Sequence, residues 1–283
     1  MVGRMADTPH ELVGWPVIHQ YFRIDRARWH GLSAEAREAA VAEFSARLRE
    51  LGGEEGLQFV PMAGIAKADF GYMAVHPELR RLQQLGQQLA ATALGTCLTP
   101  VYAFLSISEV SEYMSSPADW AKQLIEGQGL DPASPEFAKS MAGFAARMRH
   151  YAEARVHPQL PADMQVVCFY PMSKLRGEQR NWYALPFEER KKLMGGHGST
   201  GRKFAGRILQ LITSSTGLDD WEWGVTLFAH DLKSIRDVVY EMRFDEGSAL
   251  YGLFGEFYVA LRLQPDELRS ALQGELNRRQ GSR

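Results

Sequence analysis

The chain has 283 residues, which is enough for one large domain or two smaller ones. Hydrophobic residues make up 45% of it and charged residues 23%, so disorder, collagen and coiled coil are excluded as descriptions of the whole chain. The formal net charge is −2 and no basic block occurs, which disfavours nucleic-acid binding. Two cysteines are too few for a disulfide scaffold or a zinc ribbon, and they fit a reducing compartment.

The sequence shows no export or membrane signal. The first residues lack the apolar core of a signal peptide, and no stretch reaches the roughly 18 apolar residues of a membrane span. The longest candidate, 98–107, is broken by Pro100. We therefore expect a soluble cytoplasmic protein with an N-terminal tail at 1–13.

The first half, 14–114, alternates predicted strands and helices. Ser33 is a suitable N-cap for a helix that ends at the glycine pair 52–53, because apolar residues recur behind it at helical spacing. Leucines mark a second helix, at Leu79, Leu82, Leu85 and Leu89. Strands are predicted at 14–23, 68–75 and 99–109.

The second half, 162–283, repeats this order. Strands are predicted at 164–174, 221–230 and 254–263, and helices at 187–194, at 232–242 and after Pro265. The helix from Phe187 is expected to end at Met194, because a glycine-rich turn follows. In both halves an aromatic-glycine strand leads into a helix that begins with leucine. This weak internal repeat predicts two β-α-β type halves around one core.

Residues 115–161 connect the two halves. The segment contains five prolines and a helical stretch at 137–151. Its methionine and aromatic content indicates that it packs rather than remains disordered. We predict a long, partly helical connection.

Common catalytic motifs are missing. Residues 196–201 have the glycine spacing of a phosphate-binding loop, but Arg202 and Lys203 stand where Lys and Ser/Thr are needed. The motifs HExxH and GxSxG do not occur. A nucleotide-dependent enzyme is therefore disfavoured.

Two segments could carry chemistry. In a strand over 164–174, alternate side chains would share a face that ends in Tyr170, Met172 and Lys174, and such a face is expected to run from the core to a pocket or rim. His197 stands among glycines, where a flat ligand can approach, and imidazole is a common metal ligand. Composition alone favours simpler explanations, a solvated last strand residue and a histidine at a helix C-terminus.

Five long strings, taken together, point to a known family. They are Cys168-Phe-Tyr-Pro-Met-Ser-Lys174, Asn181-Trp-Tyr183, His197-Gly-Ser-Thr-Gly-Arg202, Asp219-Asp-Trp-Glu-Trp-Gly-Val225 and Glu241-Met-Arg-Phe-Asp-Glu246. The chain resembles the coproheme decarboxylases, the haem-synthesis branch of the chlorite dismutase-like family. The resemblance is strong over 155–263 and weaker but continuous over 14–113.

The resemblance implies both a fold and a reaction. The fold is α+β, with two ferredoxin-like halves that form a dimeric α+β barrel, assembled as a homopentamer. The reaction is oxidative decarboxylation of two propionates of iron coproporphyrin III (coproheme) by hydrogen peroxide. A three-propionate intermediate leads to haem b, and coproheme is both substrate and redox centre. The resemblance leaves open whether a ferrochelatase docks transiently on this protein.

The strings also imply residue roles. His197 matches the proximal iron ligand, and Tyr170 matches the catalytic tyrosine, whose radical removes hydrogen from a propionate. Lys174 matches a lysine near the reacting propionate, with Met172 packed on the porphyrin edge. Gln210 takes the distal position, where chlorite dismutases carry an arginine, and this argues against chlorite as substrate. A distal histidine base is missing as well.

Further residues match substrate contacts. They are Arg155, Tyr113 and Ser248, whereas Arg243 lies in a family string and could be structural. For Tyr113 and Arg243, a surface or interface hydrogen bond is the alternative.

Three other functions stay open. A haem-binding or delivery protein would need His197 but not Tyr170, and a haem-free structural protein would leave His197 without a ligand. A peroxidase or chlorite-degrading enzyme would be supported by a distal arginine, and Gln210 does not provide one. Tyr170 and Lys174 on one strand face favour the enzyme.

Overall fold

The computed structural model describes residues 14–274, and the predicted tail at 1–13 lies outside them. In chain order the elements are β1 (Pro16–Ile24), α1 (Arg26–Gly31), α2 (Ala34–Gly52), β2 (Gln58–Gly64), β3 (Phe70–Val75), α3 (Leu79–Ala90), η1 (Gly95–Cys97), β4 (Leu98–Ser108), α4 (Pro117–Lys122), η2 (Gln123–Gly127), α5 (Pro135–Val156), β5 (Val166–Lys174), η3 (Trp182–Ala184), α6 (Phe187–Arg202), β6 (Ile208–Ser214), β7 (Trp223–Ala229), α7 (Leu232–Met242), α8 (Glu246–Tyr251), β8 (Gly252–Phe254), β9 (Tyr258–Arg262), η4 (Pro265–Glu267) and α9 (Leu268–Gln273).

Each half follows the same order of elements. The first is β1-α2-β2-β3-α3-β4, and the second is β5-α6-β6-β7-α7 followed by β8 and β9. All strand pairings are antiparallel, and the strands lie side by side as β4-β1-β3-β2 and as β6-β7-β5-β9. This confirms the α+β class, while the domain boundaries at 114 and 161 stay a prediction.

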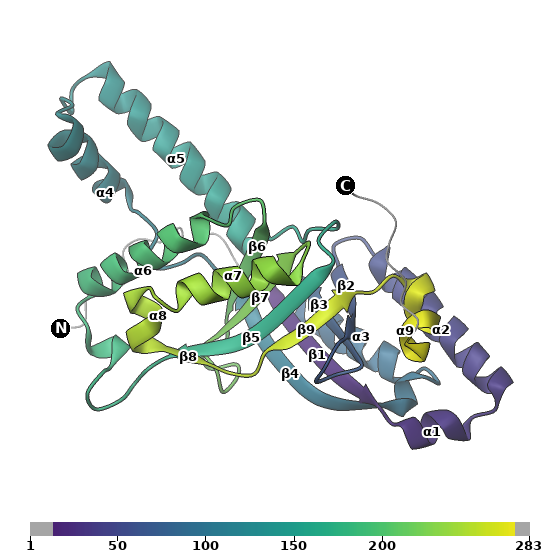
Figure 1. Ribbon diagram of the computed structural model, residues 1–283. Helices are drawn as coiled ribbons and strands as arrows, with labels where there is room; N and C mark the ends of the chain where they lie inside the picture. The colour runs from purple at the N-terminus through teal and green to yellow at the C-terminus, as the bar shows by residue number, and fades with distance from the viewer. Residues whose placement is uncertain (1–13, 275–283) are drawn as a thin grey trace.

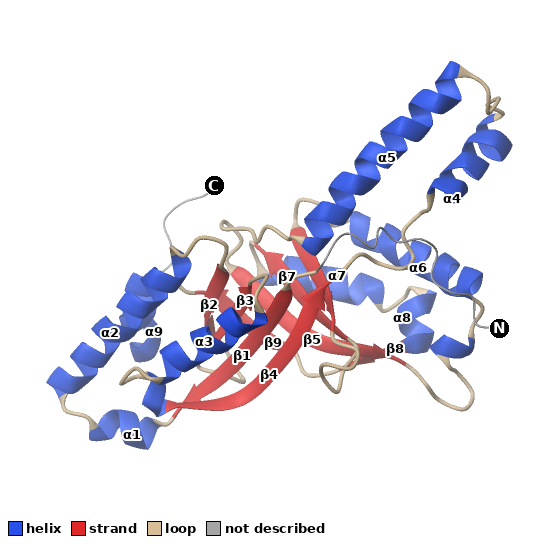
Figure 2. Cartoon of the chain, turned by 180° about the vertical axis from the view of Figure 1, so that it is seen from behind, coloured by secondary structure: helices blue, strands red, loops and turns tan. Residues whose placement is uncertain are grey.

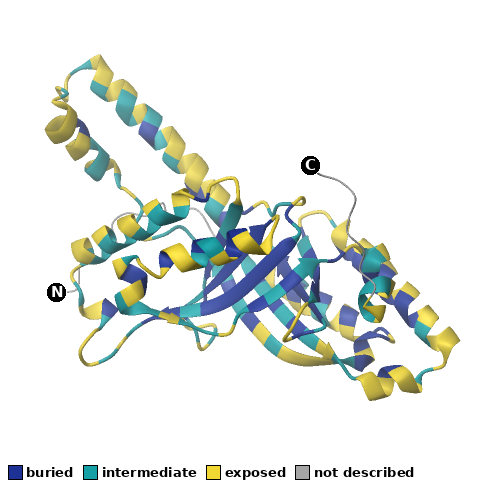
Figure 3. Cartoon of the chain, viewed as in Figure 1, coloured by how far each residue is buried: buried dark blue, intermediate teal, exposed yellow. Residues whose placement is uncertain are grey.

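The strands of the two halves form a closed circuit. β2 pairs with β9, β4 pairs with β6, and β5 pairs with β7, so the hydrogen-bonded order returns to its start. Helices α2, α3 and α9 gather at one end of the strands and α6, α7 and α8 at the other (Figures 1 and 2). Buried residues are concentrated in the central strands, above all in β3, β5 and β7 (Figure 3).

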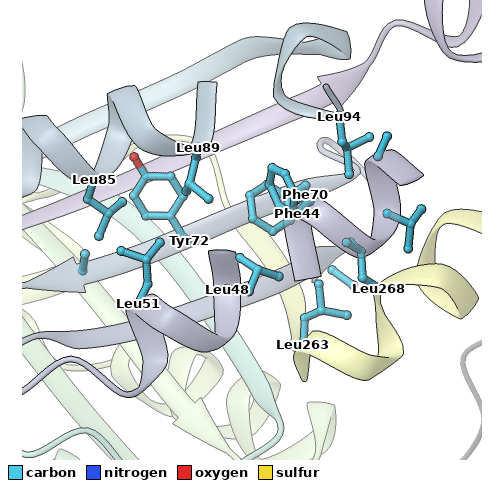
Figure 4. Packing of buried hydrophobic residues seen from close by; sticks show 14 of the residues in the cluster. Phe44, Leu48, Leu51, Phe70, Tyr72, Leu85, Leu89, Leu94, Leu263 and Leu268 are labelled. Carbon is cyan, nitrogen blue, oxygen red and sulfur yellow. The ribbon is translucent and has the colours of Figure 1, made fainter. Parts of the chain in front are cut away.

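Three hydrophobic clusters lie within residues 14–274. One lies under α2, α3 and α9 and includes Phe44, Leu48, Tyr72 and Leu268 (Figure 4). A second fills the inside of the strand circuit and takes side chains from every strand except β8. The third lies between the second-half strands and α7, and it includes Tyr170. The halves therefore have separate outer cores and one shared inner core.

Helices α4 and α5 form an arm that projects from the body (Figures 1 and 2). The rings of Trp120 and Phe144 stack within the arm, with centroids 5.5 Å apart. At its base, Lys191 of α6 lies 2.6 Å from Asp119 of α4. The predicted connection 115–161 is this arm, and it is tied to the helix that carries His197. No helix within 14–274 is long and apolar enough to cross a membrane.

The structure corrects two element predictions. The helix from Phe187 does not end at Met194 but continues to Arg202, so His197 lies inside a helix and not in a turn or at a C-cap. The predicted strand 254–263 divides into β8 and β9, which both pair with β5. The sequence reading also missed β2, β6 and α8, which tertiary pairing and packing stabilise.

Candidate functional site

A small cavity lies between the second-half strands and helices α6, α7 and α8. Its volume is about 30 Å³. Five of the eight predicted site residues line it, namely Tyr170, Met172, His197, Gln210 and Ser248. They come from β5, β6, α6 and α8, so the fold brings together residues up to 78 positions apart in the chain.

Strand register places the residues of one wall. Tyr170 and Met172 are two positions apart on β5 and share a face, as the alternation predicts. Val225 of β7 pairs with Tyr170 on one side and with Ile212 of β6 on the other. Gln210 lies two positions before Ile212 and faces the same cavity. The wall is therefore a phenol, two aliphatic side chains and an amide across three strands.

His197 lies on α6 and enters the cavity from the side opposite these three strands. Its Nδ1 lies 3.0 Å from Oδ2 of Asp245 and 3.3 Å from Oγ of Ser248. Burial raises the pKa of Asp245, but the hydrogen bond and charge of His197, with help from Ser248, outweigh burial and hold it below its usual value. With Nδ1 engaged by a carboxylate, Nε2 is the nitrogen left for a metal.

Tyr170 is a buried phenol. Its ring stacks on Phe257, with centroids 4.4 Å apart. Burial raises the pKa of Tyr170, Cys168 raises it further, and the charge of Arg243 opposes both. The phenol therefore keeps its proton at neutral pH. Arg243 itself lies 4.5 Å from the centroid of the Phe254 ring and lines the cavity, a position the sequence left open.

Lys174 lies behind the cavity wall and does not line it. Its Nζ donates to the carbonyl of Gly247 at 3.1 Å and lies 4.3 Å from the ring centroid of Trp182. The residue is only 6% exposed, so a solvated last strand residue is wrong as an explanation of this position. Burial lowers the pKa of Lys174 to about 8, against the opposing charges of Asp245 and Glu222.

Tyr113 and Arg155 also lie outside the cavity wall. The Oη of Tyr113 accepts a hydrogen bond from Nε1 of Trp182 at 3.2 Å, so it neighbours Lys174 through that ring. Arg155 lies in the last turn of α5 and reaches the carbonyl of Ile212 at 3.5 Å, while its buried Nε has no partner among the described residues. The structure thus places these two residues around the site rather than in it.

The sequence did not point to Asp245, whose carboxylate lies beside Nδ1 of His197, or to the apolar residues that line the cavity. Asp245 stands in one of the quoted strings, and an Asp three positions before Ser248 is a helix N-cap pattern, which the structure bears out. The apolar walls come from five residues, Ile212, Val225, Val239, Met242 and Phe254. No local pattern separates these from other core residues.

The donor set fits an iron porphyrin. It offers one imidazole nitrogen, apolar walls for a flat ring, and Arg243 and Ser248 for carboxylates. No group of three His, Cys, Asp or Glu within 14–274 could hold a bare metal ion. Pockets for organic ligands typically measure about 300–1,000 Å³, so this cavity is small for a porphyrin. Helix α6, which carries His197 on one side of the cavity, has no buried residue.

Comparisons with known proteins give one consistent family. A family model described as chlorite dismutase matches residues 37–263. A coproheme decarboxylase of Thermus thermophilus is 37% identical over 277 residues, which cover 96% of this chain and 99% of that protein. Haem-binding proteins inferred in Natronomonas pharaonis and Halobacterium salinarum are also 37% identical, and the chain spans 41% and 52% of their length.

Solved structures show the same fold. A haem-binding protein from Thermus thermophilus superposes with a TM-score of 0.76 at 37% identity, covering 95% of this chain and all of that one. A chlorite dismutase variant from Candidatus Nitrospira defluvii gives a TM-score of 0.68 at 17% identity, covering 93% and 96% of the two chains. The second likeness concerns the fold alone.

Proposed function

Because the chain belongs to the chlorite dismutase family, we propose that it is a coproheme decarboxylase, which converts two propionates of coproheme to vinyl groups with hydrogen peroxide. The observation that supports this most is the cavity onto which Tyr170 and His197 both open. An oxidisable phenol and an iron-binding imidazole must face one macrocycle for this reaction. The near full-length likeness to a Thermus thermophilus coproheme decarboxylase agrees with it.

The stoichiometry of the reaction determines what the site residues must do. Each propionate, with one hydrogen peroxide and one proton, gives one vinyl group, carbon dioxide and two waters. Bound iron porphyrin supplies the redox chemistry that couples peroxide reduction to phenol oxidation. His197 holds the iron through Nε2, and Asp245 accepts the Nδ1 proton and fixes the tautomer.

Tyr170 transfers hydrogen at the propionate. Its buried phenol gives up an electron and a proton to the peroxide that is being reduced, and then takes a hydrogen atom from the propionate side chain. The carbon radical gives the second electron to the same peroxide as its bond to the carboxylate breaks and carbon dioxide leaves. Lys174, four positions along β5, holds the reacting carboxylate once its ammonium is released from the Gly247 carbonyl and the Trp182 ring. A charge-assisted contact of this kind contributes about 1.5–3 kcal/mol.

The remaining carboxylates need separate anchors. Four propionates carry about four negative charges near neutral pH, because carboxyl pKa values lie near 4. Arg243 and Ser248 in the cavity wall, and Arg155 and Tyr113 around it, supply a cation or a hydroxyl donor each. These contacts hold the two propionates that do not react.

Gln210 separates this proposal from chlorite chemistry. A neutral amide can donate a hydrogen bond to peroxide but offers no fixed positive charge to an oxyanion. A haem-binding or delivery protein is the second candidate, and the names of the haloarchaeal relatives favour it. Such a protein would use His197 without the buried phenol of Tyr170.

One titration separates these functions. Purified protein is mixed with coproheme, hydrogen peroxide is added stepwise, and the porphyrin mass is followed. We expect two successive losses of a carboxyl group through a three-propionate species. Tight binding with bleaching alone would instead support a delivery protein, and an unchanged spectrum on adding coproheme would contradict both.

A further inference from the structure

Stacked tyrosines fill the inside of the strand circuit, on the face of β5 opposite the cavity. The rings of Tyr21 and Tyr102 both stack on Tyr258, with centroids 4.5 Å and 5.1 Å apart. Tyr21 and Tyr102 are paired residues of β1 and β4. Phe169 of β5 packs against both, at 6.1 Å and 6.2 Å. The proposed decarboxylation uses none of these side chains.

A short path connects this cluster to the cavity. Phe169 of β5 pairs with Tyr258 of β9, so their chain neighbours Tyr170 and Phe257 also meet, and the latter two rings stack at 4.4 Å. The route from the cavity phenol to Tyr258 is therefore one ring contact and one peptide link.

Of these three tyrosines, only Tyr258 has an acceptor for its hydroxyl proton among the described residues. The Oη of Tyr258 donates to Oε2 of Glu256 at 3.4 Å, and Lys67 holds the same carboxylate at 3.1 Å. The hydroxyls of Tyr21 and Tyr102 are buried without a partner in the part of the chain that the structure describes. Oxidation makes a phenol strongly acidic, so a phenol without an acceptor would leave a costly charge in the apolar core.

The proton acceptor also reaches solvent. The side chains of Lys67 and Glu256 are 43% and 67% exposed, whereas Tyr258 is 7% exposed. A radical on Tyr258 would thus lie at the boundary between the buried cluster and water. The exposed carboxylate of Glu256 gives this position a contact with water, whereas the phenol of Tyr170, which is 4% exposed, opens onto the cavity.

We propose that Tyr258 is a second redox-active tyrosine, which returns an electron to oxidised Tyr170 when the cavity holds no propionate able to react. This inference rests on the proposed function. In the step, the Tyr170 radical gains one electron and recovers its proton, while Tyr258 loses one electron and passes its hydroxyl proton to Glu256. A one-electron reductant of the ascorbate class then restores Tyr258.

Spin trapping on the haem b form tests this transfer. Haem b lacks the two reacting propionates, so peroxide adds oxidising equivalents that the substrate does not consume. The protein is treated with hydrogen peroxide and a nitrone spin trap, digested, and mapped by mass spectrometry. We expect a trap adduct on Tyr258. Tyr258→Phe should abolish it and reduce severalfold the peroxide tolerated before the porphyrin bleaches.

Matched variants keep the test specific. Tyr258→Phe removes a single hydroxyl, so a thermal melt should be nearly unchanged, and Glu256→Gln should lower the adduct yield while the ring stays in place. Tyr21→Phe and Tyr102→Phe should leave both adduct and bleaching unchanged. An adduct absent from the unmodified protein, or equal loss in Tyr21→Phe, would overturn the inference.

The same experiment separates this inference from the proposed function. Trapping on Tyr258 in a protein that cannot decarboxylate coproheme would overturn the decarboxylase alone. Full decarboxylation without any adduct on Tyr258 would overturn the second redox tyrosine alone.

Discussion

The Tyr170 hydroxyl is the single group whose removal should separate binding from turnover. Tyr170→Phe keeps the ring that stacks on Phe257 and packs against Phe254, so the cavity wall and coproheme affinity should persist. Decarboxylation should fall to background, because phenylalanine has no O–H to oxidise. Porphyrin mass after peroxide treatment measures this, with the exposed Tyr240→Phe as control. Turnover retained in Tyr170→Phe would remove the phenol from the mechanism.

Lys174 should make coproheme affinity depend on pH. Burial lowers its pKa to about 8, so the ammonium is charged and able to bind a carboxylate below that pH and becomes neutral above it. Affinity should therefore fall as pH rises through about 8. Lys174→Met should bind about ten- to a hundredfold more weakly at neutral pH and lose this dependence.

Spectral titrations of coproheme between about pH 6 and 10 measure the Lys174 effect. Lys174→Arg is the matched control, because an arginine stays charged across the whole range. If Lys174→Met and the unmodified protein showed parallel pH profiles, another group would be responsible.

Asp245 should tune how firmly His197 holds iron. Asp245→Asn keeps a good N-cap for α8 but replaces the charged acceptor at Nδ1 of His197. Loss of such a partner behind a metal ligand typically costs about 10- to 100-fold in affinity. Porphyrin titration should show this loss with an unchanged melting temperature. Asp231→Asn, at the N-cap of α7, should leave affinity unchanged, and an equal loss there would refute the role of Asp245.

At the scale of elements, the sequence predicted those helices and strands whose apolar residues recur at regular local spacing. The leucines from Leu82 to Leu89 and the alternation along β5 correctly gave α3 and the face that holds Tyr170. The predicted helix from Phe187 ends eight residues too early, at Met194, because Gly195, Gly196 and Gly198 oppose helix formation locally. Contacts distant in sequence override them, such as His197 with Asp245.

The residues of the candidate site also differ in whether local spacing predicts their position. Tyr170 and Met172 followed from strand alternation, and His197 stood out among its glycines, whereas Gln210 came only from the family resemblance. Lys174 was expected at a rim and is in fact buried, because η3 and α8 bring Trp182 and the Gly247 carbonyl over it. Such cross-element contacts leave no periodic trace in the chain.

Helix α6 should act as the movable wall of the cavity. It has no buried side chain, and a Cβ added at Gly195 or Gly196 would meet no atom within 4 Å. Alanine there should therefore stabilise the closed helix by about 1 kcal/mol per site without a clash. Because opening melts this turn, each substitution should slow porphyrin uptake about fivefold.

Stopped-flow mixing with coproheme measures the uptake rate of the α6 variants. Gly143→Ala in α5 is the control, since its Cβ makes only ordinary contact with Arg147 at 3.5 Å. Uptake that stays unchanged in Gly195→Ala and Gly196→Ala would show that α6 moves as a rigid body and does not melt.

At the scale of the whole molecule, the shared inner core joins the two halves. His19 of β1 is fully buried, stacks on Phe169 of β5 at 4.1 Å and bonds Thr226 of β7 at 2.9 Å. Burial lowers the pKa of His19 to about 3, so it stays neutral in the folded protein down to that pH. An unfolded histidine takes a proton near pH 6.5, so acid should weaken both halves together below that pH.

The two cysteines can report whether the halves unfold as one unit. Cys97 is 3% exposed in the first-half outer core, and Cys168 is 1% exposed in the second-half cluster. Because separating the halves would expose the inner core built from all strands but β8, neither half should unfold alone. Thiol labelling at increasing urea, with each cysteine quantified by mass, should give coincident midpoints. Labelling of Cys97 at clearly lower urea than Cys168 would show instead that the halves are independent domains, each stabilised by its own outer core.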